Sequence, residues 1–495
     1  YCRRLANHDC PVIATDRCFA NPVMLSPLPG PVRAKSMASS WECIARFFKI
    51  EGGKYILKDL MAAKTSYDVV IIGGGFAGVT AARDLQKRGL STIVLEARDR
   101  LGGRTFYEER NGFHVELGGT WIHWTQPFVW AEKERYGLEV QETPGCVAER
   151  IAIKIDGKVQ ELQEAQLGEF VEGFERFFAE SKGVWERPYD IHHCWEALCE
   201  RDALTVSDRL NALDLTPLQR TSLGGFLEIL SMNQPQNASY VEMMRTWSLT
   251  GWNYQLFNDT AARYKLTKGT AALVEAITRD GGFEVALSTA VRSVQHTSEG
   301  VSVTTESGER LMAQRAVVTV PLNVLHNVDF EPPLSDVKLE ASRLKHVGGG
   351  CKVFFEVEGD PGAVMTLSRS TDSPLIGSFT YKRGEKHSVL AGFSLEPDAL
   401  EKSVDEWQPV LEEFIPGVKV LSTFGHDWGG DDLSQGSWCT YRPGTVARFT
   451  DDLPRQEGHL FFASGDHAQG WRGFIEGAIA SGSRTAVQVA ESLST

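Results

Sequence analysis

The sequence contains no apolar run long enough to form a membrane-spanning helix. It also contains no block of lysine and arginine, and the formal net charge of −14 argues further against a nucleic-acid partner. The chain stops at Thr495, directly after its last predicted helix, and its final residues do not match the peroxisomal signal S-K-L. We therefore expect a soluble intracellular protein, located in the cytoplasm, without a C-terminal membrane anchor.

Metal-ligating patterns are missing as well. The nine cysteines are an odd number, and they occur without C-x-x-C or paired Cys/His spacing. Cys194, with His192 and His193 beside it, comes nearest to a ligand cluster, but it lacks a second ligand pair. We expect free thiols in a reducing compartment and no metal site. The sequence also shows neither a Ser/His/Asp triad nor a pair of catalytic carboxylates.

A glycine-rich motif near residue 75 is the most informative feature that the chain does have. Tyr67–Ile72 is a β-branched apolar run, typical of a buried parallel strand. Gly73, Gly75 and Gly78 follow in G-x-G-x-x-G spacing and open an Ala-rich helix that ends near Arg88. The first glycine permits the tight turn, the second lets the backbone approach a pyrophosphate, and the third permits close packing of helix and strand. The helix N-terminus supplies N–H groups to phosphates.

A second strand completes the unit. Ser91–Leu95 is again apolar and ends in Glu96, where a carboxylate accepts hydrogen bonds from a ribose diol. Strand, glycines, helix, strand and acidic residue occur in the order that a dinucleotide site requires. The alternative, a glycine-rich turn used only for packing, does not explain Glu96.

Two further loops distinguish between dinucleotides. Glu96 begins the segment E-A-R-D-R-L-G-G-R, which ends at Arg104, and E-L-G-G-T-W follows over 116–121. The pattern resembles the extended fingerprint of the flavin-dependent amine oxidases, a family that includes monoamine, polyamine and L-amino-acid oxidases. In that family the second glycine-rich loop wraps the pyrophosphate and ribityl chain of FAD, and the G-G-T-W loop lies near the isoalloxazine. The resemblance therefore implies FAD rather than NAD.

The C-terminal segment resembles the same family. Leu460–Ala463 is a short apolar strand followed by Ser-Gly-Asp, and G-W-R-G-F-I-E-G-A over 470–478 opens a helix that runs to about Leu493. Trp428–Gly444 is a third matching segment. The resemblance extends from Ser66 to the C-terminus, and the nearest pattern is that of the soluble monoamine oxidases of fungi. It implies that FAD contacts Gly73, Gly75, Phe76, Ala77, Gly78, Glu96, Ala97, Arg98, Gly102, Gly103, Arg104, Gly118, Gly119, Thr120, Trp121, Val291, Trp428, Gly465, Asp466, Gly473, Phe474 and Ile475.

The resemblance also implies a reaction site. Monoamine oxidases place two aromatic rings in front of the flavin, and the matching positions here are Trp438 and Phe474. Such rings exclude water and orient the amine. The membrane-bound relatives attach FAD through a cysteine thioether at the position of Ser437, so we expect noncovalent FAD here, with Cys439 as a poorer match for attachment.

Two other positions complete the candidate catalytic set. Many relatives hold a water against flavin N5 with a lysine, whose place we assign to Asn327. His326 beside it, or a lysine from elsewhere such as Lys352, is the alternative holder of that water. His123 in T-W-I-H-W is expected to line the space between the flavin and the substrate domain, although a lone histidine is more often structural.

These segments predict an α/β fold of the glutathione-reductase and amine-oxidase type. A Rossmann-like FAD-binding domain, discontinuous over 65–145, 265–325 and 426–495, is combined with an α+β substrate-binding domain over 146–264 and 326–425. Residues 1–64 form an N-terminal extension to which we assign no role.

The sequence is thus interpreted as an FAD-dependent amine oxidase. It would convert an amine, expected to be primary, to an imine and then to an aldehyde or ketone plus ammonia, with O2 reduced to hydrogen peroxide. The alternatives are an amine dehydrogenase with a protein electron acceptor, a polyamine or L-amino-acid oxidase, and a flavin-binding structural homologue without activity. The sequence leaves the oligomeric state open, with a homodimer as the expectation.

Overall fold

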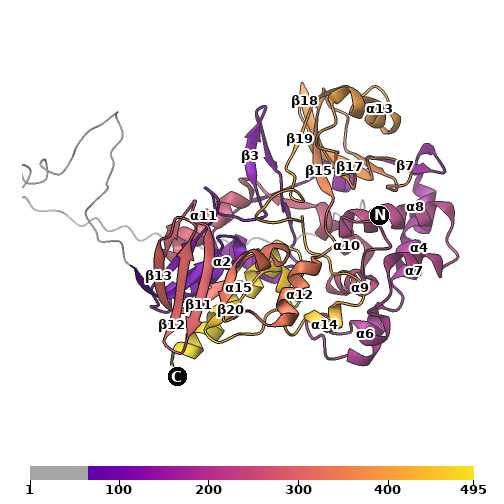
Figure 1. The fold of residues 1–495 in the computed structure, drawn as a ribbon. Helices are drawn as coiled ribbons and strands as arrows, with labels where there is room; N and C mark the ends of the chain where they lie inside the picture. The colour runs from indigo at the N-terminus through magenta and orange to yellow at the C-terminus, as the bar shows by residue number, and fades with distance from the viewer. Residues whose placement is uncertain (1–64, 495) are drawn as a thin grey trace, which may run out of the picture. The chain divides into compact units, whose positions relative to one another are not determined.

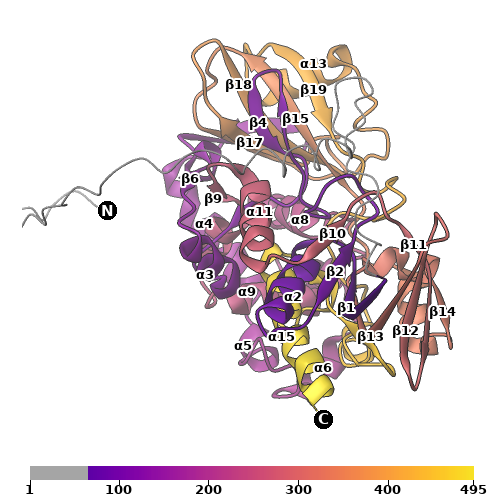
Figure 2. The same ribbon diagram turned by 90° about the vertical axis from the view of Figure 1, so that its left-hand side faces the viewer.

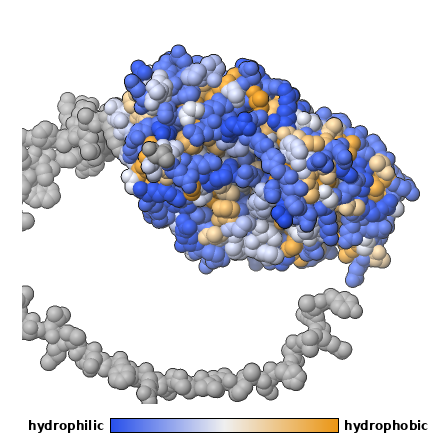
Figure 3. Space-filling model, turned by 90° about the horizontal axis from the view of Figure 1, so that it is seen from below, coloured by the Kyte–Doolittle hydropathy of each residue, from blue (hydrophilic) through white to orange (hydrophobic). Residues whose placement is uncertain are grey.

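The computed structural model describes residues 65–494 (Figures 1 and 2). The N-terminal extension, residues 1–64, lies outside the described residues. The described residues, 65–494, form one compact unit. None of the helices in the described part of the chain combines the length and the apolar character needed to cross a membrane. Figure 3 shows one face of the molecule, on which hydrophilic residues predominate and apolar residues form scattered groups.

The first sheet contains the strand that precedes the glycine motif. β1 (Ser66–Ile72) pairs in parallel with β2 (Thr92–Leu95) on one side and with β13 (Arg310–Val318) on the other. The side chains of Val69, Val70 and Ile71 are fully buried, as expected for a parallel strand covered on both faces. The sheet order is β10 (Glu284–Ala286), β2, β1, β13, β12 (Gly300–Thr305), β11 (Val291–Thr297) and β14 (Asp329–Glu331), and β20 (Leu460–Phe462) also pairs with β13.

Three helices pack together against this sheet. α2 (Phe76–Gln86) follows the glycine motif and lies between α11 (Gly269–Gly281) and α15 (Ile475–Ser494) (Figure 2). β14 comes after residue 325, where we expect a domain boundary, but it pairs in parallel with β11 and so belongs to this first sheet.

The second sheet carries the other part of the fold. Its order is β19 (Val420–Gly425), β15 (Cys351–Glu358), β18 (His387–Ser394), β17 (Gly377–Lys382), β16 (Val364–Leu367), β7 (Arg150–Ile155) and β8 (Lys158–Glu161). α13 (Val404–Phe414) covers one face of this sheet, where Trp407 packs against Phe355 with ring centroids 5.2 Å apart.

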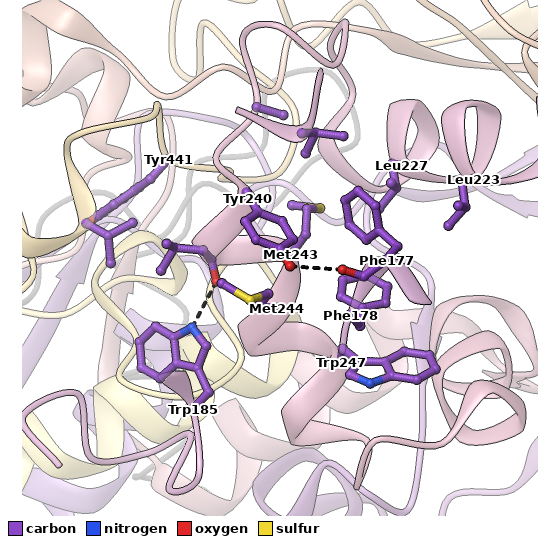
Figure 4. Packing of buried hydrophobic residues seen from close by; sticks show 14 of the residues in the cluster. Phe177, Phe178, Trp185, Leu223, Leu227, Tyr240, Met243, Met244, Trp247 and Tyr441 are labelled. Atoms are coloured by element: carbon purple, nitrogen blue, oxygen red, sulfur yellow. Dashed lines mark hydrogen bonds between the residues drawn. The ribbon is translucent and has the colours of Figure 1, made fainter. Parts of the chain in front are cut away.

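A group of helices packs beside the second sheet around a large aromatic cluster. Phe177, Phe178, Tyr240 and Trp247 lie at its centre (Figure 4). The helices are α4 (Leu167–Phe177), α5 (Ser181–Val184), α6 (Trp195–Arg201), α7 (Val206–Asn211), α8 (Pro217–Ser231), α9 (Tyr240–Leu249) and α10 (Tyr254–Ala262). Helices therefore predominate from residue 167 to residue 262, whereas residues 150–161 form β7 and β8.

The remaining elements connect these parts. A three-stranded sheet joins β5 (Trp121–Ile122), β9 (Tyr264–Leu266) and β6 (Val140–Glu142), and β3 (Tyr107–Arg110) pairs with β4 (Phe113–Glu116). Short helices complete the described chain: α3 (Pro127–Arg135), α12 (Asp336–Leu344) and α14 (Val446–Phe449).

Candidate active site

A cavity of about 420 Å³ begins where the strands of the first sheet end. Ile72 and Gly73 at the end of β1, Glu96 after β2 and Gly465 after β20 line one part of it. The carboxyl ends of parallel strands are the usual ligand-binding edge of such a sheet. The cavity continues to the second sheet and to α8, where Lys352, Phe393 and Leu230 line it.

The backbone of the glycine motif leaves room for a ligand at this edge. Gly73 has a φ of +107°, and a Cβ on Gly78 would lie 2.0 Å from the carbonyl oxygen of Gly73. Gly78 therefore serves close packing, as expected, and does not line the cavity. A Cβ on Gly75 would meet nothing nearer than the Cα of Gly103, at 3.9 Å. The N–H of Gly102 donates to the carbonyl oxygen of Gly74 (2.9 Å), which fixes the second glycine loop beside the first.

Glu96 is held in place by backbone N–H groups. Its carboxylate accepts hydrogen bonds from Gly74 N (2.6 Å) and from Arg98 N (2.8 Å), and it lines the cavity. The guanidinium of Arg98 in turn makes two hydrogen bonds to the carboxylate of Asp431, at 2.9 and 2.8 Å. This bidentate pair connects the loop after β2 to the segment that begins at Trp428.

Arg104 connects the second glycine loop to the segments that contain Ser437 and Asp466. Its guanidinium donates to Asp466 Oδ1 (2.6 Å) and to the carbonyl oxygen of Ser437 (3.0 Å). Asp466 Oδ2 accepts from Leu322 N (2.9 Å). Burial alone would raise the pKa of Asp466, but Arg104 outweighs it and holds that pKa well below the usual aspartate range. Arg104 lines the cavity and Asp466 does not, so the carboxylate acts by fixing the arginine.

Lys352 lies on β15, in the part of the cavity formed by both sheets. Its Nζ donates to the carbonyl oxygens of Glu116 (2.9 Å) and Gly118 (2.6 Å) and to Thr120 Oγ1 (2.7 Å). Burial lowers the pKa of Lys352 and raises the pKa of the Glu116 carboxyl. The ammonium group is 4.8 Å from the ring centroid of Trp121, which lines the same region.

Asn327 lines the cavity at a different place. It stands two residues before Asp329 in the sequence, and Val291 stands two residues before Ser293. Asp329 and Ser293 are paired between β14 and β11. Asn327 thus lies just before β14 and is exposed, and Val291 begins the neighbouring strand β11. Lys352 and Asn327 therefore line the cavity from different elements, β15 and the segment before β14.

Trp438 and Phe474 line the same cavity from two segments. The indole N–H of Trp438 donates to the carbonyl oxygen of Leu230 (2.7 Å), and Phe393 packs edge-on to its ring at 6.5 Å. Phe474 packs edge-on to Trp471 at 5.2 Å. Among the described residues, the rings of Trp438 and Phe474 do not stack on each other, and both line the cavity.

Ser437 and Cys439 differ in their access to the cavity. Ser437 lines it, and its buried Oγ has no hydrogen-bond partner in the described chain. Cys439 is buried outside the wall, and burial raises the pKa of its thiol. None of the cysteines in residues 65–494 lines this cavity.

His123 lies outside the cavity wall. It is fully buried, its Nδ1 is 2.9 Å from Thr125 Oγ1, and its ring stacks on Tyr264 at 5.6 Å. Burial lowers its pKa to about 4, so the ring is neutral at physiological pH. These contacts give His123 a structural position.

Most of the expected site residues are brought together. The residues that line the cavity are Gly73, Gly75, Phe76, Ala77, Glu96, Ala97, Arg98, Gly102, Gly103, Arg104, Gly118, Gly119, Thr120, Trp121, Val291, Asn327, Trp428, Trp438, Gly465, Gly473, Phe474 and Ile475. Ile229 and Leu230 of α8 also line it. Trp247 does not, because it stacks on Phe178 in the aromatic cluster (Figure 4).

Comparisons with known proteins agree with this geometry. A model of the flavin containing amine oxidoreductase family matches residues 76–490. A pseudooxynicotine dehydrogenase from a Pseudomonas species is 42% identical over 441 residues, 88% of each chain. A nicotine dehydrogenase from Pseudomonas putida is 33% identical, over 86% of this chain and 89% of its own. The solved structure of cyclohexylamine oxidase from Brevibacterium oxydans superposes with a TM-score of 0.73 at 20% identity, over 87% of this chain and all of its own.

The predicted fold class and family are thereby confirmed. The cavity is lined by the glycine loops, by the aromatic residues Trp438 and Phe474 and by the buried Lys352. The chain belongs to the family of flavin-containing amine oxidoreductases.

Proposed function

We propose that this protein is an FAD-dependent amine oxidase that converts an amine to an imine, which water hydrolyses to an aldehyde or ketone plus ammonia. The observation that carries the proposal is that Trp438 and Phe474 line one cavity together with the glycine loops. The acceptor is O2, which is reduced to hydrogen peroxide. When bound, FAD supplies the redox chemistry by accepting two electrons from the amine and passing them on.

Noncovalent attachment of FAD is supported by the residues around the cavity. Ser437 stands where the thioether cysteine of the membrane-bound relatives would be, and a serine cannot form that bond. Its unpartnered Oγ and the open space beside Gly75 fit a bound dinucleotide. FAD would be held by Glu96 at the ribose, by the N-terminus of α2 at the pyrophosphate and by the first turn of α15 at the pyrimidine.

The aromatic residues would position the amine and exclude water. Trp438 is fixed by its hydrogen bond to Leu230, so its ring presents a constant wall. Ile229, Leu230 and Phe393 make that end of the cavity apolar, which favours the uncharged amine. Lys352 is held by three oxygens and would hold a water molecule rather than bind the substrate.

The substrate is proposed as a class only. The two Pseudomonas relatives are named for nicotine and pseudooxynicotine, amines that carry an aromatic ring. An apolar cavity wall suits such an amine. We expect the preferred substrates to be amines with an apolar or aromatic body, primary amines among them, ahead of polyamines and amino acids.

A dehydrogenase is the second candidate, because both of these relatives are named dehydrogenases. In that case a protein electron acceptor would replace O2. The two candidates share the same amine chemistry and differ only in how the reduced cofactor is reoxidised.

The test has two parts. Acid precipitation of purified protein should release all of its FAD into the supernatant, and flavin retained in the pellet would contradict noncovalent binding.

Primary amines, secondary amines including pseudooxynicotine, polyamines and amino acids should then be screened for anaerobic bleaching of the flavin. Reoxidation of the bleached protein in air, with one peroxide per amine, supports the oxidase. Bleaching that air reverses only slowly, but an artificial acceptor quickly, supports the dehydrogenase. If no amine bleaches the flavin, the proposed function fails.

A further inference from the structure

A second, much smaller cavity lies directly behind the aromatic pair. It has a volume of about 20 Å³ and shares Leu230, Trp438 and Phe474 with the large cavity. Its other walls include the charged side chains of Arg245, Arg472 and Glu242. A space of this size holds one particle about as large as a water molecule.

Arg472 is fixed in this wall on three sides. Its Nη1 donates to Glu242 Oε1 (2.6 Å), its Nη2 donates to Thr450 Oγ1 (3.1 Å), and its guanidinium lies 3.8 Å from the ring centroid of Tyr441. The side chains of Arg472 and Glu242 are 3% and 6% exposed. The Nε of Arg472 is buried without a partner in the described chain.

Arg245 is fixed less completely. Its Nε donates to the carbonyl oxygen of Pro188 (3.1 Å), and its guanidinium lies 4.8 Å from the ring centroid of Trp185. That ring is held by a hydrogen bond to the carbonyl oxygen of Val241 and lies on the same side of the aromatic cluster as Tyr441 (Figure 4). Arg245 is only 2% exposed, yet its Nη1 has no partner among the described residues.

The charges around the small cavity do not balance. Two guanidinium groups share one carboxylate, Glu242, which pairs with Arg472. Within residues 65–494, Arg245 has no carboxylate within ion-pair distance. The carboxylate of Asp202 also interacts electrostatically with Glu242 and Arg472. It does not line the small cavity, and it accepts hydrogen bonds from Val446 N and Ala447 N.

The guanidinium of Arg245 keeps its charge at this position. Burial, followed by the neighbouring Arg472, lowers the pKa of Arg245 to about 9, which is still above physiological pH. A buried cation without a counter-ion is unfavourable, because it has lost its hydration and the Pro188 carbonyl and the Trp185 ring supply no full negative charge. A water molecule in the cavity would satisfy N–H groups but would not supply negative charge.

We propose that the small cavity binds a monatomic anion of halide size, chloride in the cell, between Nη1 of Arg245 and Nε of Arg472. Both unpartnered N–H groups belong to residues that line the cavity, and both carry the positive charge that a halide requires. The anion would complete the charge balance with Glu242 and support the back of Trp438 and Phe474. Binding of the anion does not depend on the proposed amine oxidation.

The first experiment measures thermal unfolding of the FAD-loaded protein in chloride, bromide and gluconate at equal ionic strength. The wild type should unfold about 2 °C higher in chloride or bromide than in gluconate, which is too large for the cavity. Arg245→Met should lose this difference. Arg448→Met is the matched control, since Arg448 is a surface residue whose side chain is 54% exposed, and it should retain the difference. Equal midpoints of wild type in chloride and gluconate would overturn the proposal, as would a chloride effect that persists in Arg245→Met.

A second measurement covers the case in which Arg245→Met does not fold. Wild-type crystals grown without halide and soaked in bromide should show an anomalous peak between Arg245 and Arg472. A water molecule or an empty cavity at that place would overturn the proposal. Neither measurement uses turnover, so both remain decisive if the amine oxidase assignment fails. If that assignment holds, chloride should also change the rate at which amine reduces the flavin, because the anion borders both aromatic rings.

Discussion

Arg104 and Asp466 are 362 positions apart in the sequence, and their side chains form an ion pair of 2.6 Å. Asp466 is completely buried, while Arg104 reaches the cavity. The pair joins the second glycine loop to the turn after β20, two segments that both border the proposed flavin site. Asp466, which lies outside the cavity wall, therefore determines the position of Arg104, which lines the cavity.

Asp466→Asn should weaken FAD binding by about tenfold or more, because it leaves the Arg104 guanidinium without its buried counter-ion. The asparagine oxygen can still accept from Leu322 N, so the backbone contact is retained. Titration of apoprotein with FAD measures the effect. Asp398→Asn, which removes a surface partner of Lys402, is the control and should bind FAD normally. Normal affinity in Asp466→Asn would show that Arg104 keeps its position without the pair.

The Arg98–Asp431 pair predicts a specific acid response. Burial on its own raises the pKa of Asp431, but Arg98 and His426 outweigh it and bring the value to about 2. Because the folded pKa lies below the ordinary aspartate pKa of about 3.9, the stabilisation is complete above pH 4 and disappears as the pH falls through 2. Asp431→Asn should therefore cost about 1–2 kcal/mol of unfolding free energy at neutral pH.

Urea unfolding at a series of pH values tests the direction in which the stabilisation by Asp431 changes with pH. The difference between wild type and Asp431→Asn should be constant above pH 4 and shrink toward pH 2. Asp451→Asn, a surface carboxylate beside His192, should differ little from wild type at every pH. A wild-type advantage that grows on acidification would refute the assignment of this pKa shift.

Short-range patterns made the flavin part of the site predictable. The glycines, the strand before them and Glu96 lie within a few dozen residues, and each residue type has one physical role at its position. The aromatic pair was also predictable, because Trp438 and Phe474 each stand inside a motif of their own. Val291, which was expected from the family resemblance, also lines the cavity, at the start of β11.

The remaining part of the site depends on pairing between distant strands. Lys352 reaches Glu116 and Gly118 because β15 lies in the second sheet, and nothing in its local sequence indicates those partners. The place of Asn327, just before the strand β14 that pairs with β11, is likewise not indicated by its local sequence. The unbalanced charge of Arg245 is likewise invisible in the sequence, where arginines are normally solvent-exposed.

Lys352→Met should slow reoxidation of the reduced flavin by about tenfold or more and change its reduction by amine much less. The substitution keeps the apolar stem but removes Nζ, which is held by three oxygens at the substrate end of the cavity. Asn327→Ala is the matched comparison and should change neither rate by more than about twofold. Stopped-flow absorbance of the two half-reactions separates them. The opposite pattern, with Asn327→Ala slow and Lys352→Met normal, would restore Asn327 to the role that we first assigned to it.

Trp438→Ala and Phe474→Ala should each slow anaerobic reduction of the flavin by a matched amine by about 10²-fold, with FAD still bound. The two rings come from different segments, and Trp438 is fixed by Leu230, so each truncation removes one wall that orients the α-carbon and excludes water. The space left behind should let bulkier amines gain relative to small ones. Trp124→Ala provides the control, because that ring is 53% exposed and lies outside the cavity wall. Unchanged reduction rates in both variants would remove the aromatic pair from the mechanism, and only membership in the family, which does not by itself establish a reaction, would remain in support of amine oxidation.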